Sequence, residues 1–248
     1  MATARGAAPL AAFVLHRYDW SESSLILDLF TRAQGRLTVV AKGAKKPHSN
    51  LRAVLLPFQR VNVSLGRLPE GEGASDIQTL RQAEWAGGMA MLTGEALFSG
   101  FYLNELLMKL LARHDAHPAL FDSYAQTLPS LASADEAVVQ SALRAFELTL
   151  LRETGLLPDL SMATLTLQQL DAERHYALRA DAGVIEALDD EVGVPGAVLA
   201  ALQSALDRGG LEALQHTCAL ALPALKVQLR ALLHYHLGST PLRTRAVM

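Results

Sequence analysis

The side chains with the clearest chemical potential are cations gathered near the N-terminus. Between Arg32 and Pro69 the chain carries eight lysines and arginines and no acidic residue. Like charges at this density create a positive field, and the natural partner of such a field is a polyanion. A solvated basic face, of the kind that many proteins carry, is the other interpretation. The eight residues are Arg32, Arg36, Lys42, Lys45, Lys46, Arg52, Arg60 and Arg67.

The sequence contains no complete pattern typical of catalysis or of metal binding. The run from Ala41 to Lys46 lacks the first glycine and the Lys-Ser/Thr ending of a phosphate-binding loop, and no GxSxG or HExxH occurs. His216 with Cys218, or His234 with His236, could pair as metal ligands, but two ligands do not complete a site. Histidines in the last turn of a helix more often stabilise the helix dipole. We therefore expect no metal and no other cofactor.

One carboxylate inside an apolar stretch needs a separate explanation. Asn104 and Glu105 lie in a strongly apolar segment, and a buried carboxylate requires partners. A structural hydrogen-bond network joining the domains explains the pair better than catalysis does. An enzyme is thus the weakest functional class, and we expect a protein without catalytic residues.

The bulk composition sets further limits. Half of the residues are apolar, so a sizeable core can be buried. The single cysteine excludes a disulfide framework and fits a reducing compartment. No apolar run approaches the roughly 20 residues that span a bilayer, and residues 1–10 do not resemble a signal peptide. These features predict a cytoplasmic protein with no membrane partner. The net charge of −3 conceals an asymmetry, because residues 1–80 carry +4 and residues 81–248 carry −7.

The elements that must position the cations are β-strands. Alternation of apolar and polar residues, together with a β-rich run over residues 23–31, predicts five short strands, with a basic loop and about one helical turn inserted after the third. This arrangement is typical of a five-stranded oligonucleotide-binding barrel, and a small SH3-like barrel is the rival. We assign residues 1–85 to this domain. The expected strands begin around Phe13 and continue over residues 23–31, 36–44, 58–66 and 77–85.

Beyond the barrel the period changes to that of helices. Residues 86–248 are expected to form a mainly α-helical body, with a small β-ribbon module near residues 159–192. The segment from Ala96 to Leu111 is apolar almost all round, as in a buried helix. The fold class is therefore α+β. Later helices are expected to start at the capping box Ser133–Glu136, at Pro195 and at Pro223.

Four stretches resemble the RecO family of bacterial recombination mediators. The N-terminal domain of that family is similar to Thr31 to Phe58, TRAQGRLTVVAKGAKKPHSNLRAVLLPF. Its central helical segment is similar to Phe101 to Tyr124, FYLNELLMKLLARHDAHPALFDSY. Its later blocks resemble Phe146 to Leu160, FELTLLRETGLLPDL, and His236 to Arg245, HLGSTPLRTR. The four matches follow the family's order and cover most of the chain.

The resemblance implies an N-terminal oligonucleotide-binding barrel, a helical body and a small zinc-binding or zinc-like module. It also implies a nucleoid-associated protein of recombinational repair that binds single- and double-stranded DNA and anneals complementary strands. Its implied protein partners are RecR, with which it helps to load RecA onto coated strands, and the C-terminal tail of single-strand-binding protein. Many members carry four cysteines ahead of the C-terminal helices, and residues 159–192 contain none here. This departure predicts a zinc-less module.

We expect DNA phosphates to be bound by the loop after the third strand and by the strands beside it. Few aromatic side chains are available to stack on bases, so binding should depend on phosphate contacts and should weaken as the salt concentration rises. The alternative function is a helical scaffold whose barrel binds a protein, and salt-sensitive binding to an oligonucleotide separates the two. The predicted DNA-binding residues are Arg32, Arg36, Lys42, Lys45, Lys46 and Arg52.

The tail of single-strand-binding protein is acidic and ends in an apolar residue, so it needs an apolar pocket beside a cation. Lys109 and Arg113 are four residues apart, which would place them on one face of the helix expected from Ala96. They are our first candidates, and a solvated helix end is the alternative interpretation. The other candidate cations are Arg144, Arg152, Lys226 and Arg230.

Overall fold

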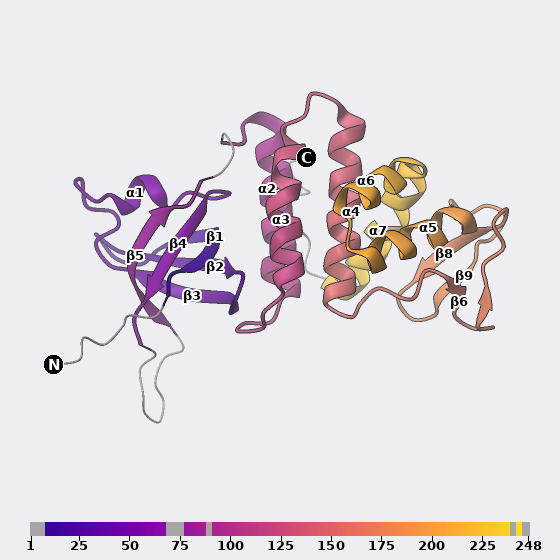
Figure 1. The fold of residues 1–248 in the computed structure, drawn as a ribbon, viewed down its shortest axis with the longest axis horizontal. Helices are drawn as coiled ribbons and strands as arrows, with labels where there is room; N and C mark the ends of the chain where they lie inside the picture. Colours follow the sequence, from indigo (N-terminus) through magenta and orange to yellow (C-terminus); the bar gives the residue numbers. More distant parts are fainter. Residues whose placement is uncertain (1–7, 68–76, 88–90, 239–241, 245–248) are drawn as a thin grey trace. The chain divides into compact units, whose positions relative to one another are not determined.

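The computed structural model describes residues 8–67, 77–87, 91–238 and 242–244 (Figure 1). The chain divides by its internal contacts into two compact units, Met1–Asp122 and Ser123–Met248, which we call unit 1 and unit 2. Where the domains of the protein begin and end stays a prediction. Within the described ranges, no helix is long and apolar enough to cross a membrane.

Unit 1 contains a closed five-stranded barrel, drawn in indigo to purple in Figure 1. The strands follow each other around the barrel in the order β1-β2-β3-β5-β4, and β1 pairs with β4 to close it. Among these strands only β3 and β5 run parallel, and the helical turn α1 (Leu51–Val54) lies between β3 and β4. This topology confirms the expected oligonucleotide-binding barrel. The strands are β1 (Leu10–Asp19), β2 (Leu25–Thr31), β3 (Gly35–Ala41), β4 (Arg60–Leu65) and β5 (Gln78–Trp85).

Alternating side chains of these strands fill the barrel. Residues such as Val14, Leu27, Leu37 and Val61 are fully or almost fully buried in one apolar cluster. Burial alternates with a period of two along β3 and in the first part of β4, as expected of strands with one face on a core, whereas β2 is buried on both faces from Leu27 to Thr31.

The first strand breaks this alternation with a β-bulge between Val14 and His16. Leu15 is the extra residue, and a bulged residue leaves the regular ladder. Its carbonyl oxygen accepts a hydrogen bond of 2.9 Å from the side-chain amide of Asn104, which is 1% exposed. Asn104 lies on α2 (Gly94–Leu110) in the same unit. The structural role expected for Asn104 is therefore confirmed, and it consists of fastening α2 to the barrel.

The chain after α2 corrects one prediction. The helix ends at Leu110, and its capping residue Leu111 is buried in an extended conformation. The backbone then runs alongside β3, where the N–H of His114 donates to the carbonyl of Arg36 at 3.0 Å. Arg113 therefore lies beyond the helix, and the prediction that Lys109 and Arg113 share a helical face is wrong. Contacts with the barrel end the helix earlier than its apolar pattern indicates.

Unit 2 is a helical body with a small β-module. The helix α3 (Pro118–Leu131) begins in unit 1 and continues into unit 2, and the apolar pattern of the sequence does not predict it. The core of unit 2 includes Cys218, whose burial raises the pKa of the thiol to about 12. The later helices are α4 (Glu136–Glu153), α5 (Gly196–Arg208), α6 (Leu211–Ala219) and α7 (Leu222–Leu237).

The start of α4 differs from the expected capping box. Asp135 is the capping residue, and its carboxylate accepts from the backbone N–H of Ala137 at 2.9 Å. The Ser133 hydroxyl accepts instead from the N–H of Asp135 at 3.1 Å. Asp is a good N-cap by itself and also favours the positive end of the helix dipole. The helix therefore starts at Glu136, two residues later than a Ser133 cap would start it.

The expected β-ribbon is present between α4 and α5. A hairpin of two short strands lies beside a three-stranded sheet in the order β10-β8-β9. These strands are β6 (Met162–Ala163), β7 (Gln168–Gln169), β8 (His175–Arg179), β9 (Gly183–Glu186) and β10 (Val194–Pro195).

The close approach of β3 to the chain after α2 generates a stability prediction. Gly35 has φ +68, and a Cβ there would collide with the backbone of Asp115. Gly87 has φ +84, but a Cβ there would meet nothing. We expect Gly87→Ala to cost about 1–2 kcal/mol for its left-handed backbone, and Gly35→Ala to cost about 3 kcal/mol or more because Asp115 must also move.

Both tryptophans of the chain, Trp20 and Trp85, lie in unit 1, so tryptophan fluorescence during urea unfolding measures the stability of this unit. Equal losses for Gly35→Ala and Gly87→Ala would show that the contact with Asp115 does not constrain the fold.

Candidate nucleic-acid interface

A hollow of about 510 Å³ opens at one end of the barrel. It lies between the β1–β2 turn and the segment from the end of β3 to α1. Three cations, two carboxylates and three apolar residues line it. They are Arg17, Lys45 and Arg52, then Asp19 and Glu22, then Leu25, Ala44 and Leu55. We call it the basic hollow.

Short polar contacts fix the walls of the basic hollow. The backbone N–H of Lys45 donates to the carbonyl of Ser23 at 3.0 Å, which ties the loop after β3 to the β1–β2 turn. The Lys45 ammonium lies 3.1 Å from the carboxylate of Asp19. The Arg17 guanidinium donates to the carbonyl of Leu55 at 3.2 Å. Arg17 and Lys45, from two separate segments, are therefore held in place before any ligand arrives, and Arg52 of α1 lines the same hollow.

Sequence reasoning identified Lys45 and Arg52 but missed Arg17. Arg17 precedes the acid-free run, and the bulge in β1 changes the direction of its side chain. After the bulge, Arg17 pairs with Leu27, whose side chain faces the barrel interior. Arg17 therefore extends over the rim of the barrel, a position that strict alternation does not predict.

Lys42 and Lys46 are exposed on the same loop but do not line the basic hollow. The loop turns at Gly43, which has φ +73, and the N–H of Lys46 donates to the Gly43 carbonyl at 3.1 Å. These two ammonium groups extend the positive surface outward from Lys45.

Arg32 lies away from this loop and is paired. Its guanidinium makes a two-pronged contact with the carboxylate of Asp122, with N–O distances of 3.0 and 2.9 Å. These hydrogen bonds raise the pKa of Arg32 and lower the pKa of Asp122. The pair joins the β2–β3 turn to α3, so a phosphate would have to compete with Asp122 for this cation.

Arg36 lies on the outer face of β3 in a polar cluster. Asp28, on the neighbouring strand, is buried and accepts from Tyr18 Oη at 3.2 Å and from Thr38 Oγ1 at 2.8 Å. Burial lowers the pKa of Arg36 and Arg113 lowers it further, whereas Asp28 opposes both effects. Arg36 is therefore a half-buried cation whose charged form is favoured by the nearby carboxylate of Asp28.

The start of α3 covers the end of this outer face that lies away from the basic hollow, beside the pair of Phe30 and Arg36. Phe121 packs against Phe13 and Phe30, with ring centroids 5.1 and 5.4 Å apart. All three side chains are buried. Oligonucleotide-binding barrels commonly bind their ligands on the face of strands 2 and 3 and on the adjoining loops. Part of that face is occupied by protein here, which leaves the end near the basic hollow.

Two exposed aromatic side chains lie close to that end in sequence. Trp20, in the β1–β2 turn next to Asp19, is 65% exposed, and Tyr18 is 44% exposed. Exposed aromatic rings beside cations provide stacking surfaces for unpaired bases. Burial raises the pKa of Tyr18 and Asp28 raises it further, so its hydroxyl stays protonated at neutral pH.

The predicted tail-binding cations do not come together. Lys109 pairs with Glu105 at 3.5 Å, and Arg113 lies in the loop beside Arg36. Arg144 is buried against Glu147 at 2.8 Å, and Arg152 contacts Asp207 at 3.2 Å. The pair that is exposed and four residues apart on one helix is Lys226 and Arg230 of α7.

The donor set does not fit a structural zinc ion. Among the residues that the structure describes, no group of three or more His, Cys, Asp or Glu side chains is placed to hold a metal. The β-module between α4 and α5 contains no cysteine. A structural zinc site requires four ligands, which are cysteine thiolates or histidine imidazoles.

Known proteins resemble the chain along nearly its whole length. The family model for the N-terminal part of recombination protein O matches residues 9–89, and the model for its C-terminal part matches residues 91–246. DNA repair protein RecO of Polaromonas sp. strain JS666 is 53% identical over 96% of this chain and 94% of its own length. Those of Variovorax paradoxus and Verminephrobacter eiseniae are 51% and 50% identical over 100% of this chain and 98% of their own lengths.

The Asp28 cluster generates a second stability prediction. Asp28→Ala removes two hydrogen bonds and leaves Arg36 half-buried without its counter-charge, so we expect a loss of about 2–3 kcal/mol. Thr38→Val, which removes one hydrogen bond and keeps the carboxylate, should cost about 1 kcal/mol. Urea unfolding followed by tryptophan fluorescence measures both. If the two variants are equally stable, the charge of Asp28 does not hold Arg36.

Proposed function

Because this chain belongs to the RecO family of DNA repair proteins, we propose that its barrel binds single- and double-stranded DNA at the basic hollow. The observation that carries the proposal is the convergence of Arg17, Lys45 and Arg52 from three segments. Phosphate oxygens are the ligands that such preorganised cations favour. Lys42 and Lys46 would extend the contact along the backbone of the nucleic acid.

The same arrangement supports strand annealing without catalysis. Two complementary strands repel each other through their phosphates, and cations that neutralise them lower this barrier. Trp20, beside the basic hollow, would stack on an unpaired base and favour single strands. No bond is made or broken in such a process, so no general acid, base or nucleophile is needed. We propose that the protein acts in this way on the bacterial chromosome, in the cytoplasm.

The partner proteins of this proposal are RecR, RecA and single-strand-binding protein. The acidic tail of single-strand-binding protein requires a cation next to an apolar surface. Lys226 and Arg230 meet this need better than Lys109 and Arg113, because Val227, which is exposed on α7, lies between them in sequence. With the tail held on unit 2 and DNA on the barrel, the protein would act together with RecR to load RecA.

Salt dependence tests the DNA proposal. Each phosphate that a single-stranded complex no longer neutralises flattens the slope of log K against log salt by about 0.7, so Arg17→Ala/Lys45→Ala/Arg52→Ala should flatten it by about 2. Fluorescence anisotropy with a labelled oligothymidylate at several salt concentrations gives the slope. The matched control removes three exposed cations of unit 2, Arg208, Lys226 and Arg230.

We expect the control to keep the parent slope. If the barrel variant keeps it too, the basic hollow is not the DNA site. If the parent itself shows no salt-sensitive binding, the scaffold function, in which the barrel binds a protein, is favoured instead.

A peptide titration tests the tail proposal. A peptide with the acidic, apolar-ended tail should bind Lys226→Ala/Arg230→Ala more weakly by about 1.5–3 kcal/mol, the range for hydrogen bonds to charged groups. Lys109→Ala/Arg113→Ala serves as the matched pair and should bind like the parent. If Lys109→Ala/Arg113→Ala weakens binding and Lys226→Ala/Arg230→Ala does not, the tail binds near the end of α2 instead.

A further inference from the structure

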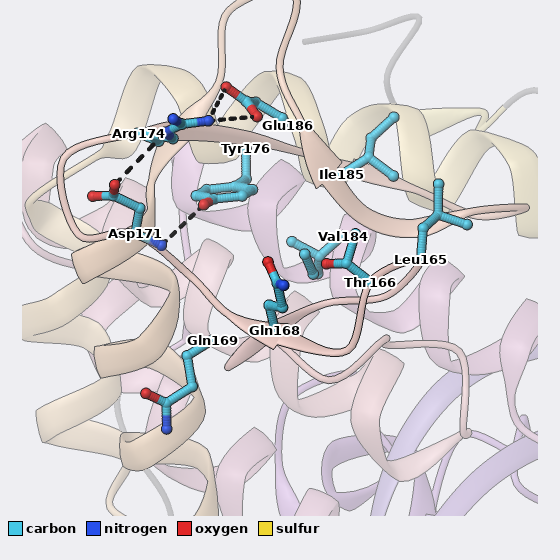
Figure 2. A pocket seen from close by; sticks show the side chains of 11 residues that line it. Leu165, Thr166, Gln168, Gln169, Asp171, Arg174, Tyr176, Val184, Ile185 and Glu186 are labelled. Carbon is cyan, nitrogen blue, oxygen red and sulfur yellow. Dashed lines mark hydrogen bonds and ion pairs between the residues drawn. The ribbon is translucent and has the colours of Figure 1, made fainter.

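A second hollow, of about 410 Å³, lies in the β-module of unit 2 (Figure 2). Its two ends differ in chemistry. Asp171, Arg174 and Glu186 form a charged end, whereas Leu165 and Ile185 form an apolar end. We call it the module hollow. It belongs to unit 2, whereas the cations proposed to bind DNA belong to unit 1.

The module around this hollow is strongly acidic. Residues 159–192 contain eight acidic and two basic residues, a net charge of −6, whereas the whole chain carries only −3. Both cations are already paired, since Arg174 contacts Glu186 at 3.0 Å and Arg179 contacts Glu191 at 2.9 Å. The field of the module therefore repels nucleic acid and attracts cationic groups.

Two large apolar side chains stand exposed in the turn beside the module hollow, and Leu165 is the one that lines it. Leu165 is 76% exposed and Leu167 is 74% exposed, both in the turn between β6 and β7. Leu167 also has φ +55, a left-handed conformation that is unfavourable for a leucine. An exposed leucine in this conformation lowers stability through its strained backbone, and its apolar side chain remains in contact with water. Such outliers cluster where a protein binds something.

The hollow is formed before any ligand arrives. The β6–β7 turn is fixed to β9 by two hydrogen bonds, from the N–H of Thr164 to the Val184 carbonyl at 2.9 Å and from the N–H of Val184 to Thr164 Oγ1 at 2.8 Å. The buried Tyr176 fixes the charged end, because its hydroxyl accepts from the N–H of Asp171 at 2.9 Å. A preorganised site loses less entropy on binding.

We propose that the module hollow binds a protein segment that carries a lysine or arginine next to a large apolar residue. The cation would meet the carboxylates of Asp171 and Glu186. Arg174 contacts both of them, at 3.6 and 3.0 Å, so one positive charge faces two negative charges. The apolar side chain would cover Leu165 and Ile185 and extend over the turn that carries Leu167. A partner of this chemistry matches both ends of the hollow and the sign of the field, and DNA matches neither.

Selection from a random displayed peptide library on the immobilised full-length chain tests the proposal. Sequences with a cation beside an apolar residue should be enriched, and their affinity is then measured by anisotropy with the most enriched peptide. Two variants probe the two ends, Asp171→Asn/Glu186→Gln and Leu165→Ser/Leu167→Asn. We expect each to weaken binding about tenfold or more, as for the loss of a charged hydrogen bond or of a buried leucine.

The variants are chosen to keep the fold. The change Asp171→Asn removes the charge but keeps the side-chain oxygen that accepts from the N–H of Glu173 at 3.0 Å. Leu167→Asn replaces leucine by a residue that tolerates the left-handed conformation, so the melting temperature should not fall. Matched controls on the same module, Asp189→Asn/Asp190→Asn and Leu188→Ser, should bind the peptide like the parent.

Four results would overturn the proposal. The first is enrichment of the same peptides on the parent and on both hollow variants, and the second is a consensus of acidic peptides. The third is loss of oligonucleotide binding in the hollow variants, which would make nucleic acid the occupant. The fourth is a change of the sedimentation coefficient in these variants, which would make a second copy of the chain the occupant.

Discussion

The packing of the segment after α2 against the start of β3 is the constraint on which unit 1 depends. A glycine at position 35 allows the backbone of Asp115 to lie where a side chain would otherwise be. From that contact the chain enters α3, whose Phe121 covers Phe13 and Phe30 and whose Asp122 pairs with Arg32. The protein's own α3 therefore covers one end of the outer face of the barrel. The other end of this face, near Arg17, Lys45 and Arg52, is not covered by α3.

Most of the barrel can be predicted from local sequence, but the position of Arg17 at its rim cannot. Alternation along β3 and β4 predicts these strands because each has one face on a core, and the β-rich composition of residues 25–31 predicts β2. The bulge at Leu15 reverses the alternation of β1, and this reversal places Tyr18 beside Asp28 and Arg17 beside the basic hollow. The bulge is stabilised by Asn104, which lies 89 positions away in the sequence. A local pattern contains no information about such a partner.

The helical errors have a similar origin. An apolar run continues past Leu110, but the chain leaves the helix because Leu111 is buried in an extended conformation. Lys109 and Arg113 therefore separate, although their spacing is that of one helical face. Charge composition correctly indicates Lys45 and Arg52, which line the basic hollow. It does so because a count of charges does not depend on where each helix or strand begins and ends. Composition indicates which surface is basic, whereas tertiary contacts decide which of its cations are already paired.

The burial of Cys218 has a chemical consequence for a protein that works on damaged DNA. Peroxides attack thiolates, and a thiol whose pKa is raised to about 12 is almost wholly protonated at neutral pH. Cys218 is the only cysteine of the chain and is closed off from solvent. The folded protein therefore offers oxidants no reactive sulfhydryl group while the oxidants that break DNA strands are present.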